Sequence, residues 1–178
     1  MTIDADRDGF RAVYASNRDA VWRYVRRRGL NETAAEDVVS EVFAIAWRRR
    51  AATPPDPGPW LYGIARRVLA NHHRAAGRRE ALVDRVRRFT VDREPDHADR
   101  IGVRQDLAAG LARLGEADRE LLLLAAWEGL DNDELAVALG CRPGTAAVRL
   151  SRARSRLRAQ LDPPTGGTLA GPPRTEEA

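Results

Sequence analysis

The sequence predicts an all-α protein made of two small helical domains joined by a flexible linker, with a helix-turn-helix in the C-terminal domain. Three observations lead to this fold class. Apolar residues recur at spacings of three and four over most of the chain, which is the period of an amphipathic helix. A stretch at 80–103 breaks this pattern with acidic residues and a proline. Residues 130–161 then carry the signals of two helices joined by a tight turn.

The helix-turn-helix prediction rests on residues that start and stop helices. Asp131 is placed to cap the first helix, and Glu134 can bond back as the second half of a capping box. Gly140 supplies the left-handed conformation that ends this helix, and Pro143 suits the first position of the next. The second helix is expected to bury one stripe of residues: Ala146, Leu150, Ala153 and Leu157.

The outer side of that second helix is strongly basic. Its outward residues are Val148, Arg149, Ser151, Arg152 and Ser155. Residues 142–161 contain six arginines and no acid, and a basic helix after a tight turn is the part of a helix-turn-helix that enters the DNA major groove. The alternative is an antiparallel helical hairpin whose arginines are only a solvated surface.

Composition restricts the class of protein. A chain of 178 residues has room for one ordinary domain or two small ones, and 43% hydrophobic with 31% charged residues is typical of a soluble globular protein. The formal net charge is +4 and the sequence pI is about 10.1, which favours a polyanionic partner. All 30 basic residues are Arg, which indicates a coding bias more than selection for binding.

Cysteine usage and hydropathy indicate a cytoplasmic protein. The single cysteine excludes an internal disulfide and fits a reducing compartment. The first ten residues are polar and acidic, unlike a signal peptide, and no apolar run approaches the length that spans a membrane. Cys141 itself falls at an apolar position in the turn, where a buried structural thiol is expected rather than a redox sensor.

Two helices are expected before residue 50. Apolar spacing predicts the first over 8–28, ended by Gly29. The second begins at Thr33, with Glu36 completing a capping box, and runs to residue 48. Its outward face is small or acidic and suits a flat contact with another protein. That face carries Asp37, Ser40, Glu41 and Ala44, with Trp47 near the helix end.

A stiff loop and a basic helix follow. Four prolines make 51–59 a short loop, and a third helix is predicted over 60–77. Polar and aromatic side chains remain for its surface: Trp60, Tyr62, Arg66, Arg67, Asn71, His72, His73, Arg74, Arg78 and Arg79. Arginines interleaved with aromatics suit single-stranded nucleic acid, because bases stack on flat side chains while guanidinium groups bind phosphate. The alternative is that Trp60 and Tyr62 are core aromatics.

The C-terminal half begins after the predicted linker. Helical pattern resumes at Arg104, and 118–127 is apolar on nearly every side and is expected to be buried. One further apolar stripe is expected at Leu107, Leu111 and Leu114. Residues 104–141 hold eight acids and three arginines, so the helices expected to pack behind the basic helix are acidic. The final stretch, 162–178, is rich in Pro and Gly and is predicted to be a disordered tail.

Four stretches in this order and spacing carry a family resemblance. They are AAEDVVSEVFAIAW (34–47), PWLYGIARRVLANHHRAAGRR (59–79), LARLGEADRELLLLAAWEGL (111–130) and DNDELAVALGCRPGTAAVRLSRARSRL (131–157). Together they resemble the extracytoplasmic-function (ECF) sigma factors, the smallest members of the main bacterial sigma-factor family. The resemblance implies sigma region 2 at 8–79, a linker at 80–103 and sigma region 4 at 104–161.

The resemblance implies a subunit of RNA polymerase that confers promoter recognition, with no catalysis and no cofactor or metal of its own. It implies contact with the β′ clamp of core polymerase through Asp37, Ser40, Glu41, Ala44 and Trp47. It implies opening of the −10 promoter element and capture of a flipped base by Trp60, Arg66, Arg67, Asn71, Arg74 and Arg78. It implies recognition of the −35 duplex by Arg142, Thr145, Ala147, Val148, Arg149 and Arg152. The β flap of polymerase and an anti-sigma factor are further implied partners.

Details of the sequence refine these expectations. Where the family often shows Thr-Val-Lys-Ser-Arg, this chain has Thr-Ala-Ala-Val-Arg at 145–149. Arg149 and Arg152 are therefore expected to contact bases or phosphates, and Val148 to pack on a thymine methyl. Arg67 stands where the family commonly has Asn, and Asn71 where it commonly has Asp, so the base preference at −10 is open.

Two other classes of function compete with this interpretation. A stand-alone helix-turn-helix regulator explains the C-terminal half, but it leaves the 33–48 helix and the 59–79 stretch without a role. It predicts tight duplex binding by the protein alone. An enzyme would need clustered ligands or catalytic groups, and the three histidines show no ligand spacing. A metal site at Glu36, Asp37 and Glu41 is disfavoured because acids in a first turn usually complement the helix dipole.

Overall fold

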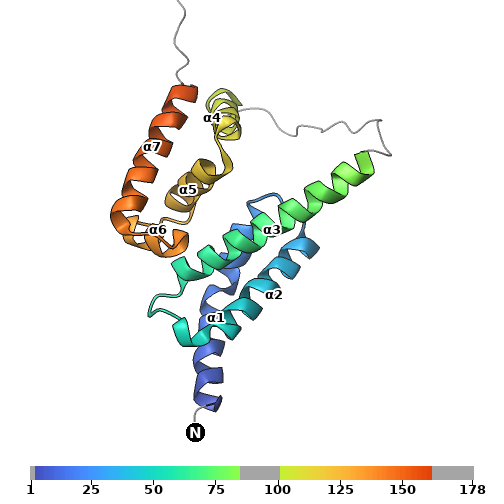
Figure 1. Ribbon diagram of the computed structural model, residues 1–178, viewed down its shortest axis with the longest axis vertical. Coiled ribbons are helices and arrows are strands. Elements are labelled where there is room, and N and C mark those ends of the chain that lie inside the picture. Colours follow the sequence, from blue (N-terminus) through green and yellow to red (C-terminus); the bar gives the residue numbers. More distant parts are fainter. Residues whose placement is uncertain (1–2, 85–100, 162–178) are drawn as a thin grey trace, which may run out of the picture.

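The computed structural model describes residues 3–84 and 101–161, and side chains at 6–75 and 107–161. The predicted all-α fold is confirmed for these residues. The elements are α1 (Ile3–Arg26), α2 (Glu32–Arg48), the short 3₁₀ helix η1 (Arg50–Ala52), α3 (Gly58–Asp84), α4 (Ile101–Arg113), α5 (Glu116–Trp127), α6 (Asn132–Leu139) and α7 (Pro143–Leu161). Figure 1 shows an N-terminal unit, α1–α3, beside a C-terminal unit, α4–α7.

The expected linker and tail fall mostly outside the described residues. Residues 80–84 belong to α3 and 101–103 to α4, so the helices extend into both ends of the stretch expected at 80–103. The expected tail at 162–178 lies outside the described residues altogether.

The N-terminal unit is organised around α2, whose inward side is buried. Its buried residues are Ala35, Val38, Val39, Val42, Phe43 and Ala46. They join one hydrophobic cluster with apolar side chains of α1 and α3. On the rim of this cluster, Arg18 of α1 donates two hydrogen bonds of 2.9 Å to the carboxylate of Glu36 on α2. Because α2 buries one side between its neighbours, its opposite side is left facing solvent.

The start of α2 differs from the sequence prediction. The helix is capped by Asn31, whose Oδ1 accepts a 2.9 Å hydrogen bond from the Ala34 N–H, and Thr33 lies inside the first turn. The predicted capping box of Thr33 and Glu36 is therefore wrong. Asn is as strong an N-cap as Thr, and capping two residues earlier leaves Glu36 available to pair with Arg18.

The proline-rich loop is shorter than predicted, because helical residues occupy both of its ends. Residues 50–52 form η1, and α3 begins at Gly58 rather than at Trp60. Asp56 Oδ1 accepts a 3.2 Å hydrogen bond from the Gly58 N–H at this start. Pro59 is buried in the first turn of α3, a place where a missing N–H carries no cost.

The C-terminal unit contains the predicted helix-turn-helix. Asp131 Oδ1 accepts 2.9 Å hydrogen bonds from the N–H groups of Asp133 and Glu134, and Glu134 Oε2 accepts from the Asp131 N–H at 2.8 Å. This capping box is the one predicted. Gly140 ends α6 with φ 66° and ψ 42°, and Pro143 begins α7, also as predicted. The buried stripe of α7 consists of Ala146, Leu150 and Ala153, with Leu157 partly buried.

Two apolar residues of this unit are more exposed than predicted. Trp127 is the last residue of α5, just before the turn at Gly129 (φ 73°), and it is 53% exposed. Leu107 on α4 is 41% exposed. α4 approaches α7 at Gly110, where an added methyl group would lie 3.0 Å from Leu161, so Leu107 is left at the edge of the contact.

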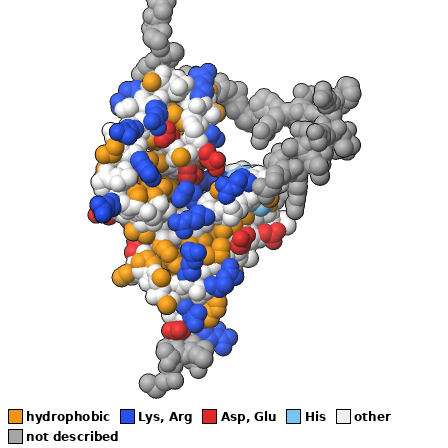
Figure 2. Space-filling model, in the orientation of Figure 1, with side chains coloured by type: hydrophobic (Ala, Val, Ile, Leu, Met, Phe, Trp, Pro, Cys, Tyr) orange, Lys and Arg blue, Asp and Glu red, His pale blue; other side chains and the backbone are white. Residues whose placement is uncertain are grey.

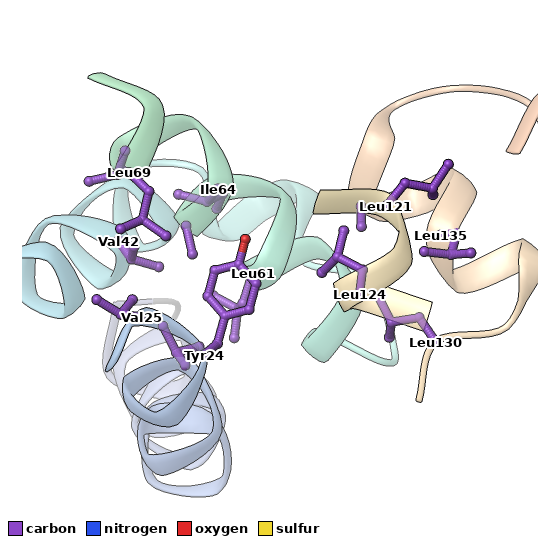
Figure 3. Close-up of a cluster of buried hydrophobic side chains, with 14 of the residues drawn as sticks. Tyr24, Val25, Val42, Leu61, Ile64, Leu69, Leu121, Leu124, Leu130 and Leu135 are labelled. Atoms are coloured by element: carbon purple, nitrogen blue, oxygen red, sulfur yellow. The ribbon is translucent and has the colours of Figure 1, made fainter. Parts of the chain in front are cut away.

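The two units are packed against each other through α3 and α6. The buried residues of both units form one continuous cluster, and Figure 3 shows Tyr24 and Leu61 beside Leu124. At the closest point Gly63 of α3 faces the backbone of Ala138 on α6. A methyl group added to Gly63 would lie 2.7 Å from the Ala138 carbonyl oxygen, a distance that real side chains do not adopt. The helices therefore meet backbone to backbone at this position.

The capping box generates a stability prediction. Asp131→Ala removes the acceptor for two N–H groups at the start of α6, so the free energy of unfolding should fall by about 1 kcal/mol. Urea unfolding followed by circular dichroism measures this. Asp133→Ala is the matched control, since it removes the same charge from the same turn without removing the cap. Equal losses in the two variants would contradict a capping role.

Candidate nucleic-acid and protein interfaces

The outer face of α7 gathers the residues expected to meet the −35 duplex. Thr145, Val148, Arg149 and Arg152 are exposed on α7, Arg142 is exposed just before it, and Ala147 is partly buried. Figure 2 shows basic side chains distributed over α7. Val148 is 50% exposed among them. An aliphatic side chain set between arginines suits a surface that meets both phosphates and base methyl groups.

The exposed stripe on α3 brings together four of the residues expected at the −10 element. With 3.6 residues per turn, Trp60, Arg67, Asn71 and Arg74 lie within about 60° of one another around the helix axis. Arg67, Asn71 and Arg74 are exposed, and Arg74 Nη2 donates a 2.5 Å hydrogen bond to Asn71 Oδ1. We call these four residues the α3 stripe. The side chain of Arg78 lies outside the described residues.

The aromatic residues of α3 combine the two alternatives that the sequence left open. Trp60 and Tyr62 are both partly buried and pack against the hydrophobic cluster. Tyr62 also stands 5.1 Å from Tyr24, centroid to centroid. Each ring therefore contributes to the core and retains an accessible edge.

Arg66 lies on a different face of α3 from the stripe. It lines an open pocket of about 550 Å³ between α1, α3 and α5, together with Tyr24, Arg28, Arg119 and Glu120 among other residues. The Nε atoms of Arg66 and Arg119 are buried and have no hydrogen-bond partner among the described residues. Arg66 thus points toward the C-terminal unit, which its spacing in the sequence did not predict.

The outward face of α2 is free for contact with a protein. Asp37, Ser40, Glu41 and Ala44 are all exposed, one or two to each turn. Among the described ion pairs, none involves Asp37 or Glu41. Trp47 is partly buried and packs edge-on against Phe10, with ring centroids 5.2 Å apart. This face is consequently exposed and acidic, and the buried side of α2 supports it from behind.

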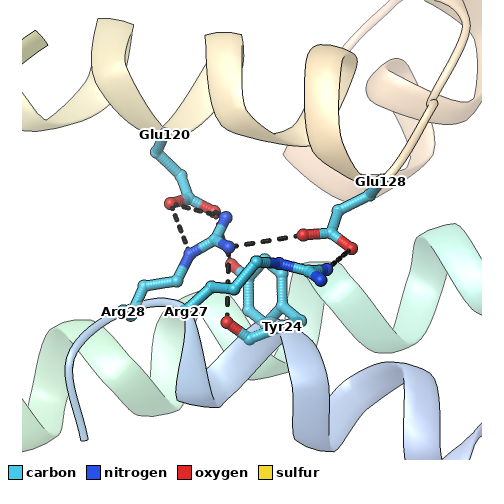
Figure 4. A network of polar contacts seen from close by, with 5 residues as sticks. All are labelled: Tyr24, Arg27, Arg28, Glu120 and Glu128. Atoms are coloured by element: carbon cyan, nitrogen blue, oxygen red, sulfur yellow. Dashed lines mark hydrogen bonds and ion pairs between the residues drawn. The ribbon is translucent and has the colours of Figure 1, made fainter. Parts of the chain in front are cut away.

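A network of charged residues joins the two units, and sequence reasoning missed it. Arg28, near the end of α1, donates to both carboxylate oxygens of Glu120 on α5, at 3.0 Å for Nη2–Oε1 and 3.3 Å for Nε–Oε2. Its Nη1 reaches Glu128 Oε1 at 3.4 Å, and its guanidinium lies 3.7 Å from the centroid of the Tyr24 ring. Arg27 donates to Glu128, and the Tyr24 hydroxyl donates to Glu120 (Figure 4).

This network is buried except at Arg27, whose side chain is 35% exposed. The side chain of Arg28 is 9% exposed, that of Glu120 is 15% exposed and that of Glu128 is 2% exposed. Burial raises the pKa of the Tyr24 hydroxyl well above its usual value, and the charge of Glu120 adds to this effect. Burial also raises the pKa of Tyr62, with the charge of Glu128 as the next cause. At the junction of the units, the phenol of Tyr24 therefore lies near the carboxylate of Glu120, and that of Tyr62 near the carboxylate of Glu128.

A sequence signal for the network existed. Residues 26–28 form a basic run and 104–141 hold an excess of acids, so opposite charges stood on the two units. Charge runs alone do not give a pairing, because most of them are solvated. Only the fold brings Arg28 within reach of Glu120, 92 residues further along the chain.

Other kinds of site find no support among the described residues. Within those ranges no group of three His, Cys, Asp or Glu side chains is placed to hold a metal ion. None of the described helices combines the length and the apolar character needed for a bilayer span. Cys141 is a free, partly buried thiol that packs against the hydrophobic cluster, in the apolar position expected for it.

Comparison with known families matches each unit separately. Residues 13–79 match the family model for Sigma-70 region 2, and residues 104–157 match the one for Sigma-70, region 4. Among curated proteins, the ECF RNA polymerase sigma factor SigD of Mycobacterium bovis is 33% identical over 173 residues, covering 89% of this chain and 80% of the relative. The ECF RNA polymerase sigma factor SigL of Mycobacterium tuberculosis is 28% identical over 155 residues, covering 85% and 88%.

Solved structures give the same likeness over both units. The sigma factor RpoE in complex with the anti-sigma factor NepR from Bartonella quintana matches with a TM-score of 0.59 and 25% identity, covering 88% of this chain and 98% of that one. CnrH in complex with the cytosolic domain of CnrY matches with a TM-score of 0.57 and 26% identity, covering 88% and 89%.

The raised pKa of Tyr24 generates a pH prediction. An unfolded tyrosine ionises near pH 10, whereas folded Tyr24 stays neutral to higher pH, so its contribution to stability is complete below about pH 10 and is lost as pH rises above it. The chain has no lysine to obscure this range. Urea unfolding between about pH 8 and 11.5 should show stability falling above about pH 10, less steeply in Tyr24→Phe. Tyr14→Phe, at an exposed position, is the control, and an equal change of slope there would contradict the assignment.

Proposed function

The chain belongs to the ECF family of RNA polymerase sigma factors. From that premise we propose which of its surfaces binds core polymerase and which surfaces bind the two promoter elements. The protein binds core RNA polymerase and directs promoter-specific initiation of transcription. We assign polymerase binding and −10 recognition to 8–79, −35 recognition to 104–161, and linker and tail roles to 80–103 and 162–178. The observation that carries this proposal is that an acidic exposed face on α2 and a basic exposed face on α7 stand on separate units.

The α2 face is the proposed docking surface for the β′ clamp. Asp37 and Glu41 offer two carboxylates without described ion pairs. The side chains of Ser40 and Ala44 are small, so a partner can approach the helix closely beside these carboxylates. Trp47 closes the helix end, with its ring fixed by Phe10. Unpaired acids on a rigid helix favour a partner with basic residues at matching spacing, since little conformational entropy is lost on binding.

The α3 stripe is the proposed contact to the −10 element. Arg67 and Arg74 can bind phosphates while Asn71 offers an amide to a base edge, and the accessible edge of Trp60 can stack on an unpaired base. Stacking and phosphate contacts can offset the few kcal/mol required to unstack a base. Arg66 and Arg78 complete the proposed set, although Arg66 is partly buried and lines the pocket between α1, α3 and α5 rather than the α3 stripe.

The outer face of α7 is the proposed −35 reader. Arg149 and Arg152 are placed for guanine edges or phosphates, Val148 for a thymine methyl, and Arg142 and Thr145 for the phosphates at the mouth of the groove, with Ala147 allowing close approach. The C-terminal unit is also the proposed site for the β flap of polymerase.

The remaining assignments follow from the family. We propose that the protein catalyses no reaction itself and works in the cytoplasm, where RNA polymerase is found. We also propose regulation by an anti-sigma factor, since RpoE of Bartonella quintana and CnrH are similar in fold, the first in complex with the anti-sigma factor NepR and the second with the cytosolic domain of CnrY.

Run-off transcription tests the proposal as a whole. Purified bacterial core polymerase, with and without this protein, is supplied with a pool of candidate promoters. Specific start sites that depend on the protein support the proposal, and their upstream sequences give the −35 and −10 preferences. If core polymerase never binds the protein while the protein alone shifts duplex DNA, the stand-alone regulator is the better description.

The α2 assignment predicts a loss of polymerase binding on charge reversal. Asp37→Arg with Glu41→Arg should weaken binding to core polymerase by at least about tenfold, because close charge pairs contribute one or more kcal/mol at interfaces. Both residues are exposed, so the circular dichroism spectrum should not change. Asp8→Arg with Asp19→Arg makes the same charge change on α1 and serves as the control. Unchanged co-purification of the α2 variant with core polymerase would refute the assignment.

The α7 assignment predicts a loss of promoter discrimination. Arg149→Ala should lower transcription from cognate promoters by the equivalent of about 1–3 kcal/mol and leave core binding intact, because one bidentate base contact is lost. The readout is run-off transcription on the mapped promoters and on variants changed at the −35 element. Arg158→Ala, which removes an exposed arginine from the last turn of α7, is the control. Equal transcription by wild type and Arg149→Ala would show that Arg149 makes no such contact.

A further inference from the structure

We propose that the open pocket between α1, α3 and α5 binds a phosphoryl group, either as free phosphate or as part of a small phosphate ester. Arg66 of α3 and Arg119 of α5 hold this group. The pocket has a volume of about 550 Å³, which is within the range of small-molecule sites. It is separate from the exposed faces of α2 and α7, so the proposal goes beyond the binding of polymerase and promoter.

The two arginines have hydrogen-bond donors to spare. The Nε atoms of Arg66 and Arg119 are buried and have no partner in the part of the chain that the structure describes. None of the side-chain hydrogen bonds or ion pairs described there involves Arg66, and Arg119 donates only from Nη2, to the Leu114 carbonyl oxygen at 3.0 Å. A buried donor on a charged group is costly to leave unsatisfied. A ligand that accepts hydrogen bonds from both side chains is therefore favoured.

The acids at the pocket leave the charges of these two arginines uncompensated. The network described above joins two arginines to two glutamates, so it is neutral as a whole, and its carboxylates point toward its own arginines (Figure 4). The remaining acid of the lining, Glu116, is exposed, and water and salt screen an exposed charge. His73 also lines the pocket and brings no negative charge. Positive charge therefore exceeds negative charge at Arg66 and Arg119, which favours an anion.

The donors suit a tetrahedral anion in particular. A guanidinium group is a planar fork of N–H groups that binds phosphate oxygens in pairs. A phosphoryl group has enough oxygens to accept from two forks that come from different helices. A carboxylate has only two oxygens, and one fork already occupies both. Two partly buried arginines on one pocket therefore favour phosphate chemistry over a carboxylate.

The same pocket offers apolar surface beside the arginines. Leu69 and Ala70 of α3 and Leu123 of α5 contribute to its lining. Sites for small molecules usually combine apolar walls with a few polar groups that fix the orientation of the ligand. An organic group attached to the phosphate can lie against these side chains. A phosphate ester is consequently expected to bind more tightly than phosphate alone.

The experiment measures binding to the free, full-length protein at constant ionic strength. The probe is ADP with a fluorescent label on the ribose, followed by fluorescence anisotropy, and unlabelled ADP and inorganic phosphate are the competitors. Arg66→Gln and Arg119→Gln each remove one fork, so each should weaken binding by at least about tenfold. Arg113→Gln removes an exposed arginine at the end of α4, outside the pocket, and is the control of equal charge. Circular dichroism checks that all variants are folded.

The competition data decide whether the site exists and what it holds. Displacement of the probe by phosphate, together with weaker binding in both pocket variants and unchanged binding in Arg113→Gln, supports the proposal. Within that result, tighter binding of ADP than of phosphate identifies a phosphate ester as the ligand, and equal binding identifies free phosphate. No displacement by millimolar phosphate, or an equal loss in Arg113→Gln, overturns the proposal.

DNA phosphates offer the same chemistry, so a second titration uses a labelled duplex of arbitrary sequence. Arg66 is shared with the proposed −10 set, which makes Arg119 the decisive residue, because Arg119 belongs to none of the proposed DNA-binding sets. Arg119→Gln should weaken duplex binding no more than Arg113→Gln does, since both lower the net charge by one. A loss of duplex binding in Arg119→Gln as large as its loss of ADP binding would assign the pocket to DNA and overturn the small-molecule site.

Discussion

The backbone contact between α3 and α6 at Gly63 and Ala138 is the interaction on which the arrangement of this protein depends. Each unit is a set of three or four helices, and a domain of that size buries a smaller fraction of its surface by itself than a larger domain does. Side chains longer than glycine would hold the helices apart and divide the hydrophobic cluster in two. With glycine there, Leu61 and Leu124 join one continuous core, and the charged network at the end of α1 closes around its edge.

Local signals in the sequence predicted the parts of the fold that local chemistry determines. The capping box of Asp131 and Glu134, the left-handed Gly140 and the start of α7 at Pro143 lie where they were predicted. Each depends on residues within four positions, so short-range rules suffice. The predicted start of α2 was wrong because short-range rules alone could not choose between two candidate caps. Two acceptable caps stood two residues apart, and Glu36, which the box at Thr33 would need, pairs instead with a residue of another helix.

Properties that depend on contact between distant residues were not predictable from one sequence. Neither the exposure of Trp127 nor the direction of Arg66 toward α5 could be read from the spacing of apolar and polar residues. The charged network requires pairs separated by 92 to 101 residues. Of the candidate surfaces, exposure of the α2 and α7 faces was predictable because amphipathic spacing decides which side of a helix is free. The spacing of α3 could not reveal that one of its polar sides faces the other unit.

Trp127 also gives the protein an optical property. It is the tryptophan of the C-terminal unit, half exposed at the end of α5 and adjacent in sequence to the buried Glu128. The other three tryptophans lie in the N-terminal unit and are partly buried. An indole in water emits at longer wavelength than one in an apolar surrounding, so the red part of the emission belongs mainly to Trp127. The molecule therefore carries, without any label, a reporter whose colour depends on what covers that edge of the C-terminal unit.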